Sequence, residues 1–161
     1  MNSIKQMPND ARVWVFQSNR SLSETEVNAI RKAGLDFVAG WKGHGASLKA
    51  SFDVLFDRFI IIAVDEQQAS AGGCSIDSSI HFVKNLENQF NLNLLDRMQV
   101  AYRKGNEILT CTLSEFEKLA NLNLVNESTI VFNNMVSTKM EFDTNWEVNL
   151  KQSWQSRVLQ G

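Results

Sequence analysis

Residues 59–66 read Phe59-Ile60-Ile61-Ile62-Ala63-Val64-Asp65-Glu66, an unbroken apolar run that ends in two acids. No polar side chain alternates with the apolar ones, so both faces of this strand are expected to be covered. The segment Arg12-Val13-Trp14-Val15-Phe16-Gln17 also lacks alternation. We therefore predict two inner strands of one sheet, at 12–17 and at 59–64.

Helices and half-exposed strands are predicted around these two segments. Overlapping capping boxes at Ser21 and Ser23 begin a helix that ends near Gly40, with an apolar stripe at a spacing close to that of a helix. Gly34 lies inside that stripe, and close packing on a sheet is the simplest reason for a glycine there. The other predicted elements are a half-exposed strand at 48–54, a helix at 77–90, hairpin strands at 98–103 and 107–113, a short helix after Ser114, and strands at 128–132 and 146–151.

The order of these elements through residue 103 is βαββαβ. In the ferredoxin-like arrangement of that order the first and third strands are central, and these are the two strands without alternation. We predict an α+β fold, a single domain over residues 11–161 with a ferredoxin-like βαββαβ core and an antiparallel sheet. A C-terminal hairpin, a short helix and extended segments are expected to lengthen the sheet or cover its open face. The alternative is another antiparallel α/β sandwich with a different strand order. Residues 1–10, which hold the only proline, are predicted to be a disordered tail.

Composition and charge exclude several classes of protein. The chain has 161 residues, 43% of them hydrophobic and 21% charged, which is ordinary for a globular domain. A formal net charge of −2 predicts no nucleic-acid partner and no attachment to anionic membranes. Cys74 and Cys111 are too few for a disulfide framework or a zinc site, and the apolar run at 59–64 is too short to span a bilayer. We expect a cytoplasmic protein with reduced thiols, no signal peptide, no metal and no cofactor.

The loop after strand 59–64 is the first candidate site. Gly72-Gly73-Cys74-Ser75-Ile76-Asp77 joins that strand to the start of a helix, where backbone N–H groups are free and the helix dipole is positive. We predict a pocket there for a small anionic ligand, with the Ser75 hydroxyl as a further donor. Its expected lining residues are Gly72, Gly73, Cys74, Ser75 and Asp77, with Asp65 or Glu66 at the rim. The alternative is a purely structural connection that needs positive φ at its glycines.

Cys74 is also a candidate nucleophile. A thiol near a helix start, with His81 as a base and Asp77 as a carboxylate, has the composition of a thiol-dependent site. Asp77 and His81 are four residues apart and can pair on one helix face. His81, however, lies opposite the apolar stripe of that helix and is expected to point to solvent rather than back at Cys74. The alternative is a small thiol in a tight loop, with Asp77 as the N-cap.

The segment Gly40-Trp41-Lys42-Gly43-His44-Gly45-Ala46-Ser47 is only superficially similar to a phosphate-binding loop. The pattern G-x-x-x-x-G-K-[ST] requires a lysine where Ala46 stands. The segment also follows a helix and precedes a strand, which is the reverse of the required context. We therefore predict that the chain is not an ATPase. His44 is either a ligand on this loop or an exposed histidine without a role.

Large side chains late in the chain either close the fold or form an interface. Trp146 and Trp154 are expected to clamp the C-terminal segment onto the rest of the protein, or to lie at a contact with another chain. Cys111 alternates with apolar neighbours and is expected in the core. A ferredoxin-like sheet leaves one face open, so a C-terminal segment or a second copy in a homodimer is expected to cover it.

Several short motifs of the chain resemble those of one family. They are Arg12-Val13-Trp14-Val15-Phe16-Gln17-Ser18-Asn19-Arg20, Val64-Asp65-Glu66, Gly73-Cys74-Ser75-Ile76-Asp77, Ile130-Val131-Phe132-Asn133-Asn134 and Asn145-Trp146-Glu147-Val148. Nearly the whole chain resembles an uncharacterised family of small bacterial proteins of about this length, whose members often carry the automatic label "ABC transporter ATPase". That label does not fit the chain, which lacks the Walker A lysine and a Leu-Ser-Gly-Gly-Gln signature. The resemblance implies no catalytic residue.

Two functions of different classes follow from these residues. The first is a non-catalytic module that binds a small ligand or regulates a partner, because no complete catalytic set is visible. The second is a small enzyme that uses Cys74 as a thiol nucleophile, with Asp77 or His81 assisting.

Overall fold

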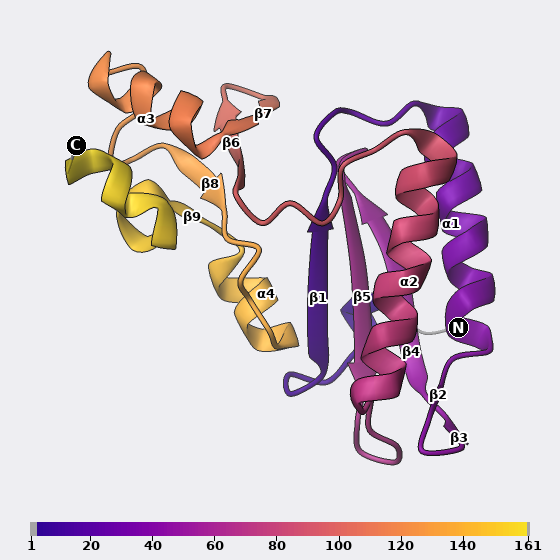
Figure 1. Ribbon diagram of the computed structural model, residues 1–161. Helices are drawn as coiled ribbons and strands as arrows, with labels where there is room; N and C mark the ends of the chain where they lie inside the picture. Colours follow the sequence, from indigo (N-terminus) through magenta and orange to yellow (C-terminus); the bar gives the residue numbers. More distant parts are fainter. Residues whose placement is uncertain (1–2, 161) are drawn as a thin grey trace.

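The computed structural model describes residues 3–160 and has a mixed α+β architecture with antiparallel sheets. Figure 1 shows helices on one side of a first sheet and the C-terminal third of the chain on the other. The elements in chain order, with η for a 3₁₀ helix, are η1 Ile4–Gln6, β1 Arg12–Gln17, α1 Glu24–Ala39, β2 Lys42–Gly43, β3 Ala46–Ser47, β4 Lys49–Leu55, β5 Phe59–Asp65, α2 Gly73–Phe90, β6 Gln99–Lys104, β7 Glu107–Thr112, α3 Leu113–Asn121, β8 Ile130–Phe132, α4 Lys139–Asn145, β9 Glu147–Asn149, η2 Leu150–Gln152 and η3 Trp154–Gln160.

β5 is the middle strand of the first sheet, whose order is β1-β5-β4. Both neighbours run antiparallel to it, so that Ile62 lies opposite Trp14 on one side and opposite Phe52 on the other. Every residue of β5 is buried. The apolar run at 59–64 therefore forms an inner strand with both faces covered, as its lack of alternation predicts.

β1 lies at the edge of this sheet, which corrects the prediction of an inner strand at 12–17. The predicted fourth strand, β6, pairs instead with β7 and β8 in a second sheet of order β7-β6-β8-β9. The expected single sheet with β6 beside β1 is therefore not formed. The lack of alternation in β1 reflects two covered faces, because helices pack on one face and the C-terminal third packs on the other. The hydropathy of side chains does not show whether a strand lies at the edge of a sheet, since the groups left unpaired at an edge are backbone N–H and C=O groups.

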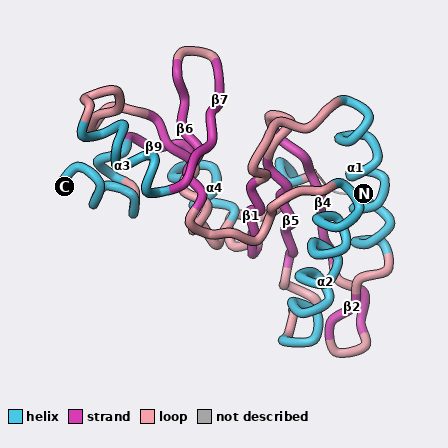
Figure 2. The backbone as a smooth tube through the Cα atoms, turned by 45° about the horizontal axis from the view of Figure 1, so that its top comes forward, coloured by secondary structure: helices cyan, strands magenta, loops and turns pink. Residues whose placement is uncertain are grey.

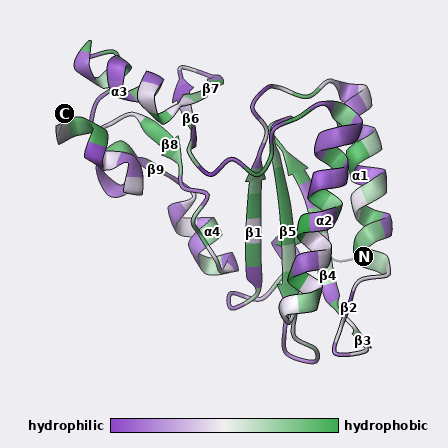
Figure 3. Ribbon diagram, viewed as in Figure 1, coloured by the Kyte–Doolittle hydropathy of each residue, from purple (hydrophilic) through white to green (hydrophobic). Residues whose placement is uncertain are grey.

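α1 and α2 lie side by side over one face of the first sheet (Figure 1). α1 begins with a capping box, in which Ser23 Oγ accepts from the Glu26 N–H at 3.1 Å. A side chain at Gly34 would clash with the Phe52 ring of β4, so this glycine permits the close packing that its place in the apolar stripe predicts. Figure 3 shows the strands of this sheet as mainly hydrophobic and the helices as mixed, which is the pattern of a core between them.

The C-terminal third covers the other face of the first sheet, which is one of the two roles predicted for it. Trp146 is 5% exposed, and its ring centroid lies 5.0 Å from that of Phe59 and 5.0 Å from that of Phe132. The Phe142 ring stacks on it at 4.6 Å. Trp146 therefore clamps the C-terminal layer onto β5, and the chain itself provides the cover that was expected from a C-terminal segment or a second copy.

Residues 3–10 differ from the predicted disordered tail. Ile4–Gln6 form η1, and Ile4 and Met7 are buried in the same core as Val13 and Ile61. The remainder of that tail, residues 1–2, lies outside the described residues. Two apolar residues without a period are too weak a pattern to predict this docking.

The second sheet has a core of its own with α3 and η3, in which Phe116, Val131 and Leu150 are fully buried. The β6–β7 hairpin turns at Gly105 (φ 63°), between the two predicted hairpin strands (Figure 2). Arg58, in the turn before β5, donates to the Ile108 carbonyl of β7 at 3.2 Å, so the hairpin contacts one end of the first sheet. Cys111 of β7 packs against this core, and burial raises the pKa of its thiol to about 11. Such a thiol stays protonated at neutral pH, which fits the packing role predicted for Cys111.

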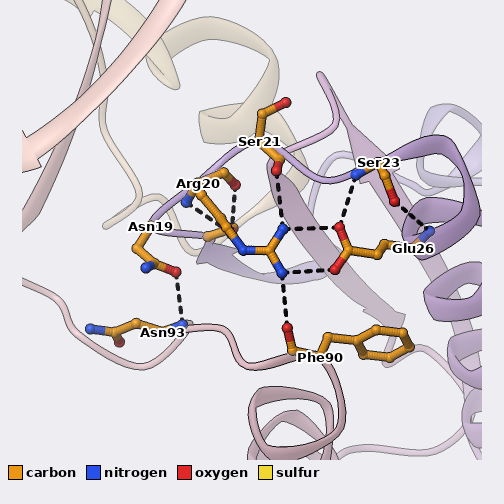
Figure 4. A network of polar contacts seen from close by, with 8 residues as sticks. Asn19, Arg20, Ser21, Ser23, Glu26, Phe90 and Asn93 are labelled. Atoms are coloured by element: carbon orange, nitrogen blue, oxygen red, sulfur yellow. Dashed lines mark hydrogen bonds and ion pairs between the residues drawn. The ribbon is translucent and has the colours of Figure 1, made fainter.

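Arg20 joins the start of α1 to the end of α2 (Figure 4). Its guanidinium donates to the two carboxylate oxygens of Glu26 at 2.9 and 2.7 Å, and to the Phe90 carbonyl at 2.9 Å. The hydrogen bonds from Arg20 lower the pKa of Glu26 to about 2. Nearby, the Asn93 N–H donates to Asn19 Oδ1 at 2.9 Å. These contacts hold the loop after β1 against both helices.

Candidate functional site

α2 begins at Gly73, one helical turn earlier than the predicted start at Asp77. Its N-cap is Gly72, with φ −89°, and no side chain caps the first turn. The interpretation of Asp77 as the N-cap is therefore wrong, because Asp77 is an exposed residue inside the helix. Since α2 is 18 residues long and its first N–H groups lack a side-chain cap, its positive end is open.

Asp65 and Glu66 close the turn that leads from β5 to α2. Asp65 Oδ1 accepts from the Gln67 N–H at 3.1 Å. Glu66 Oε2 accepts from the Ala71 N–H at 2.8 Å. Arg12 Nη1 lies 3.6 Å from that same oxygen and donates to the Ala71 carbonyl at 3.2 Å. Both acids thus shape the loop itself.

The β2–β3 hairpin is held against the start of α2. The Trp41 indole N–H donates to the Ser75 carbonyl at 2.9 Å, and the Ser75 hydroxyl donates to the Lys42 carbonyl at 2.7 Å. A side chain at Gly43 would clash with the Ser70 carbonyl, so glycine lets the hairpin approach this closely. Because the Ser75 hydroxyl is engaged and the residue is buried, it is not the free donor that the sequence suggests.

A groove of about 400 Å³ lies between this hairpin and the start of α2, and we call it the α2 groove. Lys42 and His44 line it from the hairpin, and both are exposed. His44 has φ 52°, and its Nε2 would lie 3.0 Å from a Cβ placed on Gly72. The remaining lining residues are Gly45, Gly72, Gly73, Cys74, Ser75 and Ser78. The groove thus combines two basic side chains with the uncapped end of a helix.

The α2 groove contains some of the residues predicted for the pocket and leaves others out. The residues brought together are Gly72, Gly73, Cys74 and Ser75. The residues that do not line it are Asp65, Glu66 and Asp77. The two acids at the end of β5 are absent from the rim because their carboxylates accept from the backbone of their own loop.

The glycines of this loop do not have the positive φ that a purely structural connection was expected to need. Gly72 has φ −89°, and the glycines with positive φ are Gly45 (81°) and Gly105 (63°) in the described part of the chain. No atom lies within 4 Å of a Cβ placed on Gly73. Neither backbone conformation nor packing therefore demands glycine at position 73.

Cys74 is exposed in the groove, and the histidine that lines the groove with it is His44. His81 is exposed further along α2 and is not a lining residue, in agreement with its expected direction toward solvent. Sequence reasoning did not connect Lys42 or His44 to this loop. The available signal was Gly43, because a glycine inside a short strand permits a close approach of the backbone, here to the Ser70 carbonyl in the loop before α2.

Comparison with known protein families, with curated proteins and with solved structures found no match. Between residues 3 and 160, no helix is long and apolar enough to cross a membrane. In the same range, His, Cys, Asp and Glu side chains form no group of three that could hold a metal ion. The geometry of the α2 groove is therefore the basis for a functional proposal.

Proposed function

We propose that this protein is a non-catalytic module that binds a small anionic ligand in the α2 groove. One observation carries the proposal: the uncapped start of an 18-residue helix lines the same groove as Lys42 and His44. Free backbone N–H groups and the helix dipole favour an anion, and the lysine adds a full positive charge. The ligand class is a small molecule with a phosphate or carboxylate group.

The size and surroundings of the groove favour a small ligand over a nucleic acid. Its volume of about 400 Å³ is in the usual range of small-molecule sites. The net charge of −2 gives the rest of the protein no general attraction for polyanions. Lys42 is exposed, so added salt is expected to screen its charge and weaken binding.

Calorimetric titration with inorganic phosphate and with citrate at low ionic strength tests the proposal. We expect one of the two to bind. Lys42→Gln is expected to weaken that binding by about tenfold or more, because a hydrogen bond to a charged group contributes about 1.5–3 kcal/mol. Lys84→Gln, an exposed lysine further along α2, is the matched control and is expected to change nothing. An equal effect of the two substitutions, or no binding of either anion, would contradict the proposal.

The alternative function is a small enzyme that uses Cys74 as a nucleophile. The observation in its favour is that His44 lines the same groove and is a candidate base in place of His81. Alkylation by iodoacetamide, followed at the Cys74 peptide by mass spectrometry, tests this alternative. A lower rate in His44→Gln, with the rate of a His81→Gln control unchanged, would favour the enzyme. Equal rates in all three proteins would favour the binding module.

We infer further that the first sheet is the part of a ferredoxin-like core that remains when the fourth strand pairs elsewhere. The order β1-β5-β4, with α1 and α2 on one face, supports this, because it is the order of the first three strands in that arrangement. β6 follows α2 along the chain but belongs to the second sheet. An experimental structure with β5 at a sheet edge would contradict the inference.

A further inference from the structure

The outer edge of β1 faces a cleft instead of a fourth strand. β1 pairs with β5 along one edge, and on the other edge the Val13 N–H donates to the Ser137 carbonyl at 3.0 Å. Because backbone groups alternate in direction along a strand, the N–H and C=O groups of both Val13 and Val15 point away from β5. The Val15 carbonyl accepts from Arg97 Nη1 at 2.7 Å. Two outward groups lie between these contacts, the Val13 carbonyl and the Val15 N–H.

These two groups have no hydrogen-bond partner among residues 3–160. Val13 and Val15 are only 3% and 1% exposed. Buried backbone donors and acceptors without partners are rare, because each costs free energy comparable to a lost hydrogen bond. Because the two groups line a cleft, water or a ligand can satisfy them, and an acceptor beside a donor suits a ligand that carries one group of each kind.

The space beside them, which we call the β1 cleft, has a volume of about 370 Å³ and lies between β1 and residues 134–137. Arg12 and Arg97 both line it. Arg12 is 3.6 Å from Glu66, whereas Arg97 makes no ion pair with any carboxylate of the described chain. Arg97 is thus the cation of the cleft whose charge is open to an anionic group.

A cavity of about 20 Å³ lies behind the β1 cleft and shares Arg97, Asn134 and Met135 with it. Two of the side chains that line this cavity are buried and each has an unpaired atom, which is Nε2 in Gln17 and Oε1 in Gln155. A space of this size holds about one water. The body of any ligand must therefore lie in the larger cleft in front.

The direction of the Gln17 amide follows from Trp146. An indole N–H can only donate, so the Asn134 atom 2.9 Å from Trp146 Nε1 is the amide oxygen. Asn134 Nδ2 then donates to Gln17 Oε1 at 2.7 Å. Gln17 Nε2 is left without an acceptor in the described chain, and Gln17 is one of the residues that line the small cavity. Unpaired backbone and side-chain groups therefore gather along the same edge of β1.

We propose that the β1 cleft binds the main chain of one α-amino acid, either free or as the C-terminal residue of a peptide. The Val13 carbonyl and the Val15 N–H have the spacing that pairs with a single residue of a parallel strand. That residue donates its N–H to the first group and accepts from the second through its carbonyl. The Arg97 guanidinium donates to the Val15 carbonyl, so a carboxylate that accepts from the Val15 N–H lies beside this cation. The adjacent positive charge favours a free α-carboxylate over a peptide that continues beyond this residue.

The side chain of the bound residue falls on the same face of β1 as Trp14, since paired residues of neighbouring strands share a face. Trp14 is partly exposed, and Met135 is 66% exposed on the opposite wall of the cleft. An apolar side chain, such as that of leucine, is therefore expected. The β1 cleft and the α2 groove share no lining residue, so this site is separate from the proposed anion site.

Titration of ¹⁵N-labelled protein with L-leucine, Nα-acetyl-L-leucine and L-leucinamide tests the proposal by NMR. Leucine or its acetyl derivative is expected to shift the Val15 amide signal and to slow its hydrogen exchange. Leucinamide lacks the carboxylate and is expected to bind at least about tenfold more weakly than leucine. Binding of the acetyl derivative alone identifies the C-terminus of a peptide as the ligand, and binding of leucine alone identifies the free amino acid.

A pair of variants separates recognition from folding. Arg31 Nη2 donates to the Val54 carbonyl of edge strand β4 at 2.9 Å, so Arg31→Gln and Arg97→Gln each remove a guanidinium from an edge-strand carbonyl. Arg97→Gln is expected to weaken leucine binding about tenfold, and Arg31→Gln is expected to leave it unchanged. If Arg97→Gln does not fold, the shift of the Val15 amide signal and the comparison of leucine with leucinamide, both measured on the wild-type protein, still test the proposal. No binding of any probe, an unchanged Val15 amide on binding, or equal binding of leucinamide would overturn the proposal.

Discussion

The α2 groove and the β1 cleft are built in opposite ways. The groove joins two short surface segments, 42–45 and 72–78, and its basic side chains are exposed. The β1 cleft and the cavity behind it join β1 to segments 94–99, 132–137 and 154–155, where the N-terminal and C-terminal parts of the chain pack together. Substitutions in the groove are therefore expected to act on a ligand and to spare the fold. Substitutions in the C-terminal layer that packs against β1 and β5 are expected mainly to lower the stability of the fold.

Trp146→Ala is expected to have the largest effect on stability, because Trp146 belongs to the layer that packs against the first sheet. It removes a buried ring packed on Phe59, Phe132 and Phe142, and it leaves Asn134 Oδ1 without its donor. We expect a loss of about 3–5 kcal/mol in the free energy of unfolding, which denaturant titration measures. A change within about 0.5 kcal/mol, as at an ordinary surface position, would mean that Trp146 does not clamp the C-terminal layer.

Gly34→Ala is expected to have the next largest effect on stability, at the core between α1 and the first sheet. The added methyl group would clash with the Phe52 ring, at a cost of about 1–3 kcal/mol. Because the new Cβ would lie well within van der Waals contact distance of atoms of this ring, the cost is expected to exceed the gain of about 1 kcal/mol in helix propensity, and net destabilisation is expected in thermal or chemical unfolding. Gly40→Ala at the end of α1, where no atom lies within 4 Å of the new Cβ, is the control. Equal stability of the two variants would refute the account of Gly34.

Gly73→Ala tests the groove side of the contrast. Space is open at this position, so alanine is expected to leave stability unchanged or to raise it by up to about 1 kcal/mol through the unfolded state. Gly73→Leu is expected to fill the groove and abolish phosphate binding with little change in melting temperature. The two readouts are a melting curve and a phosphate titration. Strong destabilisation by both substitutions would show that glycine is structural here.

The smallest expected effect concerns Arg20 and Glu26. The folded-state pKa of Glu26 is about 2, below its ordinary value of 4.5, so its contribution to stability is present above pH 4.5 and is lost as the pH falls toward 2. The difference in melting temperature between the wild type and Arg20→Gln should therefore shrink from pH 6 to pH 2. Glu24→Gln, at an exposed acid of the same helix start, is the control. A difference that stays constant with pH would contradict the sign of this linkage.

The parts of the fold that could be predicted are those with local causes. The burial of β5 follows from its apolar run, and the start of α1 follows from the capping box of Ser23 and Glu26. The edge position of β1 could not be predicted, because it depends on the pairing of β6 with β7 and β8. That choice is made by contacts far apart in the sequence, and β1 has the same hydropathy whether or not its edge is paired.

The candidate site shows the same division. Residues 72–75 could be assigned to it because they follow a buried strand and start a helix. Lys42 and His44 could not, since contacts between residues far apart in the sequence bring their hairpin to this place: the Ser75 hydroxyl donates to the Lys42 carbonyl, and Gly43 lies close to Ser70. Acids at a strand end can serve a ligand or a loop, and nothing in the sequence separates the two uses. In the structure Glu66 serves the loop, because its carboxylate accepts from the Ala71 N–H.

Titration of ¹⁵N-labelled protein with inorganic phosphate at constant low ionic strength decides whether the start of α2 binds a small anion. We predict saturable shifts of the Gly73 and Cys74 amide signals, because these N–H groups lie in the uncapped first turn. The shifts are expected to weaken strongly in Lys42→Gln and to persist in Lys84→Gln. No saturable shift at Gly73 or Cys74, or the same response in both variants, would contradict the account.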